Sequence, residues 1–153
     1  MFADGAALAE SGLCNAVVVA TPNYTHRTVL EPLFDAGLHI RCKKALAHTP
    51  ADAAAIAARA ATHAQVFWTG MEYRYMPPAA RFIARVRAGE AGRPVMLAMR
   101  EHRFPFLVKV GDRNRRAANT GDTIVEKCRH FFDLMRLILR AEPVRVSARA
   151  GRT

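Results

Sequence analysis

The sequence contains no long hydrophobic run and no closely spaced cysteines. Its longest strongly apolar run, residues 16 to 20, is far shorter than the roughly 20 residues that a membrane-spanning helix needs. The cysteines Cys14, Cys42 and Cys128 lie far apart, and none forms the CxxC spacing of a zinc site or a redox pair. We therefore predict a soluble, cytoplasmic protein with reduced thiols, no metal site and no membrane partner.

Negative charge is also scarce. The 23 Lys and Arg residues outnumber the 13 Asp and Glu residues, which gives a formal net charge of +10. Clustered cations would indicate a polyanion such as nucleic acid as the partner. Apart from residues 113 to 116, however, the cations are scattered through apolar segments, and no aromatic platform for stacking bases accompanies them. We therefore do not expect a nucleic-acid partner. Nucleic-acid binding would require the scattered arginines to lie together on one face of the folded protein.

The first half of the chain alternates between strand and helix patterns. Short apolar runs at residues 15 to 23, 38 to 41 and 65 to 75 predict strands, and residues 26 to 37 between them have helical spacing. Residues 49 to 64 begin with Thr49, a helix-capping residue, and Pro50 at the first helical position. Strands that alternate with helices predict an α/β fold with a parallel sheet.

The pattern changes after residues 76 to 78, "MPP". We expect a helix over residues 79 to 92, a strand over 93 to 103 and a long polar loop over 104 to 122. A strong amphipathic helix over 123 to 139 and a strand over 142 to 150 follow. The sequence thus predicts two domains, residues 1–74 and 75–153, of which the second is of the α+β class.

The last predicted helix carries a group of polar residues. At helical spacing, Glu126, His130 and Asp133 share one face, and a histidine between carboxylates suits a general base. From the helix alone we favour the simpler hypothesis, in which His130 is a partly buried structural histidine. Glu126 and His130 could also supply two metal ligands, but the sequence offers no convincing third one.

Four segments together resemble the Gfo/Idh/MocA family, which includes glucose-fructose oxidoreductase and inositol dehydrogenase. They are "VVVATPNYTH", "AGLHIRCKKALAHTP", "MEYRYMPPAARFI" and "NTGDTIVEKCRHFFDLMRLI", in the family's order. The resemblance implies a partial Rossmann domain followed by part of a substrate and oligomerisation domain. It also implies hydride transfer between NAD or NADP and a sugar, polyol or related hydroxy compound, usually in a homo-oligomer.

The same resemblance implies roles for individual residues. His130 would accept the hydroxyl proton, Lys44 would donate to the same oxygen, and Glu126, where the family commonly has aspartate, would orient His130 or the substrate. The nicotinamide side would be lined by Thr21, Pro22, Asn23, His26 and Lys44. For His26 alone, a purely structural position at the start of a helix stays an open alternative.

The sequence departs from the family pattern at several positions. No two glycines are even two residues apart, so the GxGxxG phosphate loop is missing, and we expect a member truncated at both ends. Lys43 stands where the family has glutamate. Ala45 replaces a proline, which makes a cis bond after Lys44 costly, and Asp122 replaces a glycine. The alternative function is a non-catalytic family remnant that acts as a binding or oligomerisation module.

Overall fold

The computed structural model describes residues 1–102, 108 and 110–149, except for the side chains of residues 113 and 114. It divides into two compact units. Unit 1 comprises Met1–Met71 and Arg103–Arg129, and unit 2 comprises Glu72–His102 and His130–Thr153. The division into domains at residue 74 stays a prediction; the compact units divide after Met71 and give residues 103–129 to unit 1.

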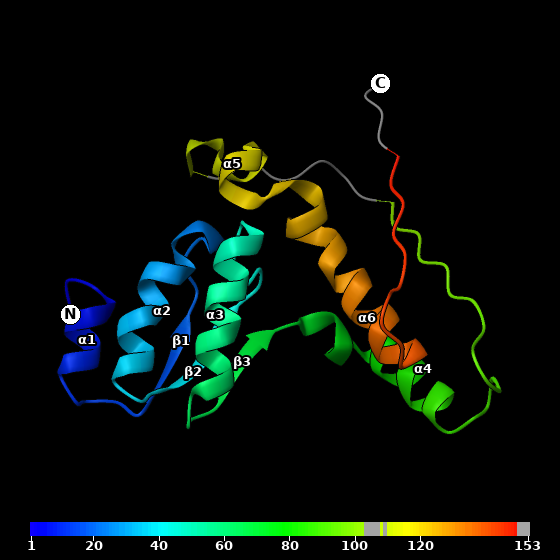
Figure 1. The fold of residues 1–153 in the computed structure, drawn as a ribbon, viewed down its shortest axis with the longest axis horizontal. Helices are drawn as coiled ribbons and strands as arrows, with labels where there is room; N and C mark the ends of the chain where they lie inside the picture. Colours follow the sequence, from blue (N-terminus) through cyan, green and yellow to red (C-terminus); the bar gives the residue numbers. More distant parts are fainter. Residues whose placement is uncertain (103–107, 109, 150–153) are drawn as a thin grey trace. The chain divides into compact units, whose positions relative to one another are not determined.

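Unit 1 is built on a three-stranded parallel sheet. Its strands β1 (Ala16–Val19), β2 (His39–Lys43) and β3 (Phe67–Gly70) lie in the order β1-β2-β3 (Figure 1). In the register, Val17 pairs with Ile40, and Ile40 pairs with Phe67. This confirms the predicted α/β class and the partial Rossmann-like sheet.

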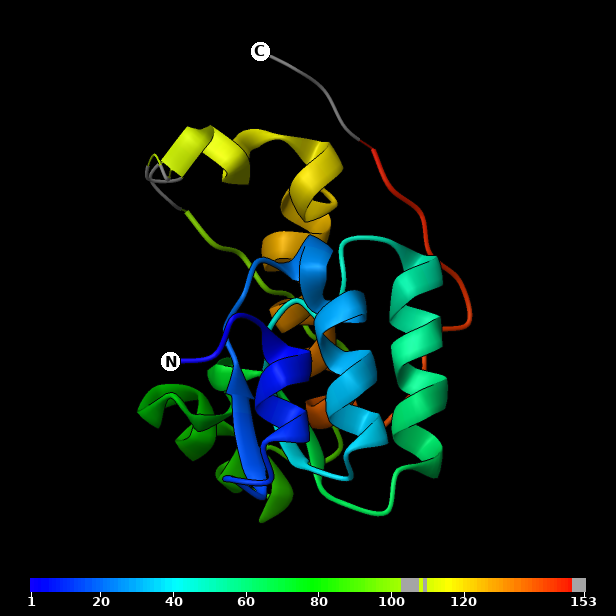
Figure 2. The ribbon, with the colours of Figure 1, turned by 90° about the vertical axis from the view of Figure 1, so that its left-hand side faces the viewer.

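Three helices accompany this sheet. They are α1 (Gly5–Glu10), α2 (His26–Asp35) and α3 (Pro50–Thr62), and Figure 2 shows them side by side on one face of the strands. The Thr49 side chain accepts a hydrogen bond from the backbone N–H of Asp52 at 3.1 Å, so the predicted N-cap is confirmed. Because α3 is rich in alanine, few of its side chains are bulky, and Ile56 is its one buried residue.

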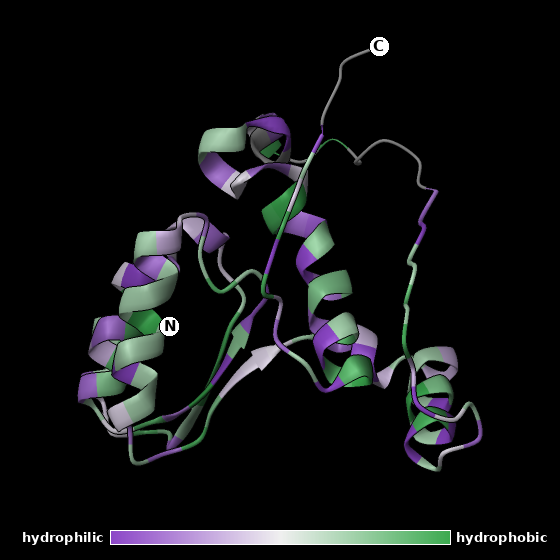
Figure 3. Cartoon of the chain, turned by 45° about the vertical axis from the view of Figure 1, so that its right-hand side comes forward, coloured by the Kyte–Doolittle hydropathy of each residue, from purple (hydrophilic) through white to green (hydrophobic). Residues whose placement is uncertain are grey.

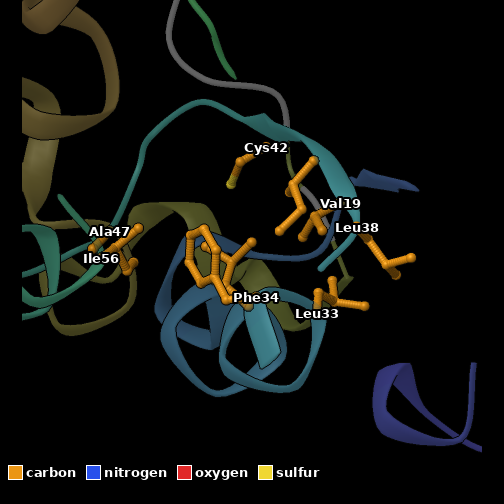
Figure 4. Packing of buried hydrophobic residues seen from close by; sticks show 9 residues of the cluster. Val19, Leu33, Phe34, Leu38, Cys42, Ala47 and Ile56 are labelled. Carbon is orange, nitrogen blue, oxygen red and sulfur yellow. The ribbon is translucent and has the colours of Figure 1, made fainter. Parts of the chain in front are cut away.

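The core of unit 1 lies between the sheet and these helices. Figure 4 shows Val19 and Cys42 of the strands above Leu33 and Phe34 of α2. Along β2 the exposure alternates, so Ile40 and Cys42 face the helices while the residues between them stay exposed. The sheet therefore has one buried face, and its strands end near the turns that carry the site residues.

Residues 110–129 complete unit 1. The prediction of a single long loop over 104–122 is wrong for residues 110–120. They form the short helices η3 (Val110–Arg115) and α5 (Ala117–Thr120). Of the rest of that loop, 104–107 and 109 lie outside the described residues. Gly121 ends α5 at φ 72°, and a Cβ there would lie 2.5 Å from the carbonyl oxygen of His48, so only glycine fits without a shift. Asp122 follows at φ 68°, a conformation that aspartate tolerates better than most residues.

Unit 2 contains helices η2 (Glu72–Tyr75), α4 (Pro77–Arg87) and α6 (Arg129–Leu139), the last preceded by a π-helical turn, η4 (Ile124–Cys128), that belongs to unit 1. Its core consists of Ile83, Leu134 and Ile138, with Leu97 and Met99 packed against it. The alternation of apolar and polar residues on α4 and α6 is visible in Figure 3.

The two strands predicted for unit 2 are absent from its described part. Residues 93–102 and 142–149 form no strand, and residues 103 and 150 lie outside the described residues. The physical reason is that a strand needs a neighbour for its backbone N–H and C=O groups, and alternation in sequence supplies none. Leu97 and Met99 still show the predicted period of two, since both face the unit 2 core.

Candidate functional site

The candidate site is a pocket of unit 1 at the carboxyl ends of β1 and β2. Parallel α/β sheets bind ligands at this edge because the polar turns after neighbouring strands meet there. The turn after β1, the end of β2 and the residues around α5 supply its lining, namely Ala20, Thr21, Pro22, Asn23, Tyr24, Lys43, Lys44, Asn119, Thr120 and Glu126. The structure thus brings five of the predicted site residues to one pocket.

Lys44 and Glu126 form an ion pair in this pocket. Nζ of Lys44 lies 3.2 Å from Oε1 of Glu126 and donates to the Glu126 carbonyl oxygen at 3.4 Å. Burial lowers the pKa of Lys44, because the charged ammonium loses solvation. The negative charge of Glu126 raises the pKa of Lys44, whereas the positive charges of Arg129 and Lys127 lower it further. The pair therefore holds a partly buried cation at the pocket.

The peptide bond after Lys44 is cis. Ala45 therefore follows a cis bond although it replaces a proline.

Asn23 fixes the turn after β1. Its side chain is buried, and Nδ2 donates to the carbonyl oxygen of Thr120 at 3.2 Å. The Thr25 hydroxyl donates to the Pro22 carbonyl oxygen at 2.8 Å within the same turn. The bond to Thr120 connects residues 97 positions apart, so Asn23 shapes the pocket wall in addition to lining it.

His26 does not line the pocket. It is fully buried, with Nε2 3.0 Å from the Thr21 carbonyl oxygen and Nδ1 3.0 Å from the Leu46 carbonyl oxygen. The Sγ atom of Cys42 is 3.4 Å from the same Nδ1. Burial raises the pKa of the Cys42 thiol to about 12, so this sulfur stays protonated at neutral pH. His26 therefore ties the turn after β1 to the segment that follows Lys44.

His130 belongs to unit 2, where it is buried at the start of α6. Its Nε2 atom is 3.5 Å from Oε1 of Glu72, and its ring stacks on Tyr73 with centroids 4.1 Å apart. That Glu126, His130 and Asp133 share one face stays a prediction, but both carboxylates form ion pairs with other residues. Glu126 pairs with Lys44, and Asp133 pairs with Arg74 through both carboxylate oxygens.

Glu126 lies in the π-helical turn Ile124–Cys128, directly before α6. A π turn advances by about one extra residue, so α-helical spacing does not carry over from Glu126 to α6.

Comparison with known proteins identifies the fold and the family. Residues 1–71 match the family model described as "Oxidoreductase family, NAD-binding Rossmann fold", of the Gfo/Idh/MocA group. The chain is 32% identical over 143 residues to inositol 2-dehydrogenase 1 of Saccharopolyspora erythraea, covering 91% of this chain and 39% of that protein. It is 30% identical over 136 residues to the myo-inositol dehydrogenase Hyg17 of Streptomyces leeuwenhoekii, covering 88% and 40%. Residues 1–71 belong to the Gfo/Idh/MocA oxidoreductase family.

Solved structures agree with this family assignment at the level of the fold. A probable dehydrogenase from Thermotoga maritima superposes with a TM-score of 0.75 at 22% identity, over 92% of this chain and 41% of that one. Apo levoglucosan dehydrogenase gives a TM-score of 0.73 at 19% identity, over 90% and 37%. The chain spans about 40% of the length of the curated relatives it matches.

Sequence reasoning missed several residues of the site in this family member. Glu72, Tyr73 and Thr120 each contact a predicted site residue from another part of the chain. No local spacing connects Glu72 with His130, and only an aligned set of relatives could have indicated the pair. Within the described ranges, no group of three His, Cys, Asp or Glu side chains could hold a metal ion, and no helix is long and apolar enough to span a bilayer.

Proposed function

We propose that the chain serves in an NAD- or NADP-dependent oxidoreductase that acts on sugars, polyols or related hydroxy compounds. The observation that carries this proposal is the Lys44–Glu126 ion pair in a pocket at the carboxyl ends of β1 and β2. Family membership supports the reaction type, and relatives named as inositol and levoglucosan dehydrogenases support the substrate class.

The residues present fit the nicotinamide end of such a cofactor. Thr21 and Tyr24 offer hydroxyl groups beside the Lys44 ammonium, a donor set that suits a ribose and a carboxamide. A bound nicotinamide supplies the hydride acceptor. The sequence holds no GxGxxG loop for the pyrophosphate, so we expect affinity to depend on the pocket itself and to be weak.

The chain's own groups would handle the proton and the oxygen. As the substrate carbon loses a hydride, its hydroxyl must also lose a proton, which leaves a carbonyl group. Lys44 would donate a hydrogen bond to that oxygen, and Glu126 would hold the ammonium in place. We propose His130 as the base that accepts the proton, with Glu72 as the carboxylate that fixes its ring. The role of His130 rests on the family resemblance.

Cofactor titration tests the proposal. NADH and NADPH are added to the chain, and energy transfer from Trp68, the only tryptophan, reports binding. We expect saturable binding that Lys44→Ala weakens about tenfold, since a charged hydrogen bond is lost. The control Arg87→Ala removes one exposed cation from α4 of unit 2 and should leave binding unchanged. Absence of binding at millimolar cofactor would contradict the proposal.

Turnover tests the reaction itself. We expect oxidation of myo-inositol or levoglucosan, followed by the absorbance of the reduced cofactor, and its loss in both Lys44→Ala and His130→Ala. A His130→Ala chain that binds cofactor normally but oxidises nothing would support the assigned base.

A non-catalytic binding or oligomerisation module is the second candidate. Exposed apolar side chains in the two unpaired segments of unit 2 favour it, namely Val95, Met96, Val144 and Val146. Homo-oligomer formation and a cytoplasmic location stay predictions. Sedimentation velocity decides the first, because a monomer at all concentrations would exclude self-association through these segments.

A further inference from the structure

The pocket carries more positive charge than its ion pair neutralises. Its charged lining residues are Lys43, Lys44 and Glu126. Glu126 is bound to Lys44, whose side chain is only 11% exposed, whereas Lys43 is an exposed residue at the end of β2. Among residues 1–102, 108 and 110–149, no carboxylate lies within ion-pairing distance of Lys43.

Two further cations, Lys127 and Arg129, lie near the ion pair. The charges of Lys127 and Arg129 act on the Lys44 ammonium, so both lie close enough to contribute to the field at the pocket. Arg129 also lies 4.0 Å from the second carboxylate oxygen of Glu126. Within the pocket lining itself, the carboxylate of Glu126 is accompanied by two cations, Lys43 and Lys44. A neutral polyol would not neutralise the positive charge of the pocket, whereas an anion would be attracted by it.

We propose that the pocket selects a polyhydroxy compound that carries an anionic group, such as a sugar acid, and that Lys43 binds this group. The proposal rests on the proposed function, because it names the substrate class of the same pocket. The different roles of the two lysines follow from their different ion pairing. Lys44 is held by Glu126 and would donate a hydrogen bond to the reacting oxygen. Lys43 would form an ion pair with a carboxylate of the substrate. The phosphates of the cofactor are the other anion that Lys43 could contact.

A matched pair of ligands tests the proposal. D-gluconate and D-sorbitol share a six-carbon hydroxylated chain and differ in one carboxylate, and each is titrated into the chain by heteronuclear NMR beside NADH. We expect gluconate to bind about fivefold more tightly than sorbitol, the effect of one solvent-accessible ion pair. Lys43→Gln should remove this preference, and Lys43→Arg should retain it.

Arg41→Gln is the control, because it removes the same charge from the same strand two residues away and outside the pocket lining. Equal binding of gluconate and sorbitol, or equal loss of preference in Lys43→Gln and Arg41→Gln, would overturn the proposal. A Lys43→Gln chain that loses NADH affinity would assign Lys43 to the cofactor and overturn it too. If NADH and sorbitol bind normally, these failures leave the proposed function intact; if no ligand binds, both fail.

Discussion

Unit 1 and unit 2 have similar patterns in sequence but differ in how completely their apolar residues are buried. Among the described residues, unit 1 has nine buried residues in its core, drawn from its strands, α2, α3 and the loops between them. Unit 2 has three, all on α4 and α6. In unit 1 each strand has a parallel neighbour, whereas the strand-like segments of unit 2 have none among the described residues.

This difference shows that alternating apolar and polar residues specify which face of a strand can be buried. They do not provide the neighbouring strand with which it pairs. Val144 and Val146 alternate with polar residues as a half-buried strand would, yet both are at least 80% exposed. In β2 the same alternation leads to burial, because β1 and β3 pair with it on both sides and residues of α2 and α3 pack over one face. We therefore expect unit 1 to be the more stable part of the chain.

The largest effects are expected when one buried leucine in each core is shortened to alanine. Leu30 of α2 is fully buried, so Leu30→Ala should lower the free energy of unfolding by about 3 kcal/mol. Leu134 of α6 is 8% exposed and packs in the smaller core, so Leu134→Ala should cost about 2 kcal/mol. Urea unfolding followed by NMR should show unit 2 unfolding first, with each variant shifting its own transition. One shared transition that both variants shift equally would remove the distinction.

A smaller effect on stability is expected at Gly121, where the backbone of unit 1 packs closely. Gly121→Ala places a methyl group against the carbonyl oxygen of His48 at a positive φ, and it should cost about 2 kcal/mol. Gly37→Ala is the control, since Gly37 also has a positive φ but no atom within 4 Å of the added Cβ. It should cost about 1 kcal/mol. Equal losses in thermal unfolding would show that the close approach to residue 48 contributes nothing.

The elements of unit 1 could be predicted from sequence because their signals are local. Thr49 and Pro50 mark the start of α3, and the apolar runs mark β1 and β2. The pocket could be located because turns after parallel strands meet at one edge. Lys44 was singled out by family resemblance alone.

The remaining contacts could not be predicted because they join distant segments. Arg74 and Asp133 are 59 residues apart, and Asn23 and Thr120 are 97 apart. The contacts of His130 were missed for another reason as well. A single π turn changes which residues share a face, and apolar periodicity over a few residues does not distinguish it from an α-helix.

Ion pairs in unit 2 should have a smaller effect than its core. Asp133 is 13% exposed and bonded to Arg74, which raises the pKa of that guanidinium, so Asp133→Asn should cost about 1 kcal/mol. Glu142→Gln breaks the exposed pair with Arg136 and should change stability by less than about 0.5 kcal/mol. Chemical denaturation compares the two variants. A larger loss in Glu142→Gln would show that burial does not govern these pairs.

The smallest expected effect is the response of unit 1 to alkaline pH. Burial lowers the pKa of Lys44, so below its usual value of 10.5 the unfolded chain holds more protons there, and stability rises with pH. Burial raises the pKa of Cys42 from 9.0 to about 12, so above about pH 9 the folded chain holds more protons, and stability falls.

Two variants separate these opposed contributions in urea titrations between about pH 7 and 9.5. Relative to the unmodified chain, Lys44→Met should make stability fall more steeply with pH, because only the Cys42 contribution stays. Cys42→Ser should make the fall shallower by about 0.4 kcal/mol at pH 9, where half of the unfolded thiols are ionised. Both groups lie in unit 1, so the unit 2 transition should keep its pH dependence in both variants. A change confined to unit 2 would mean that the burial of these two groups does not control the stability of the sheet.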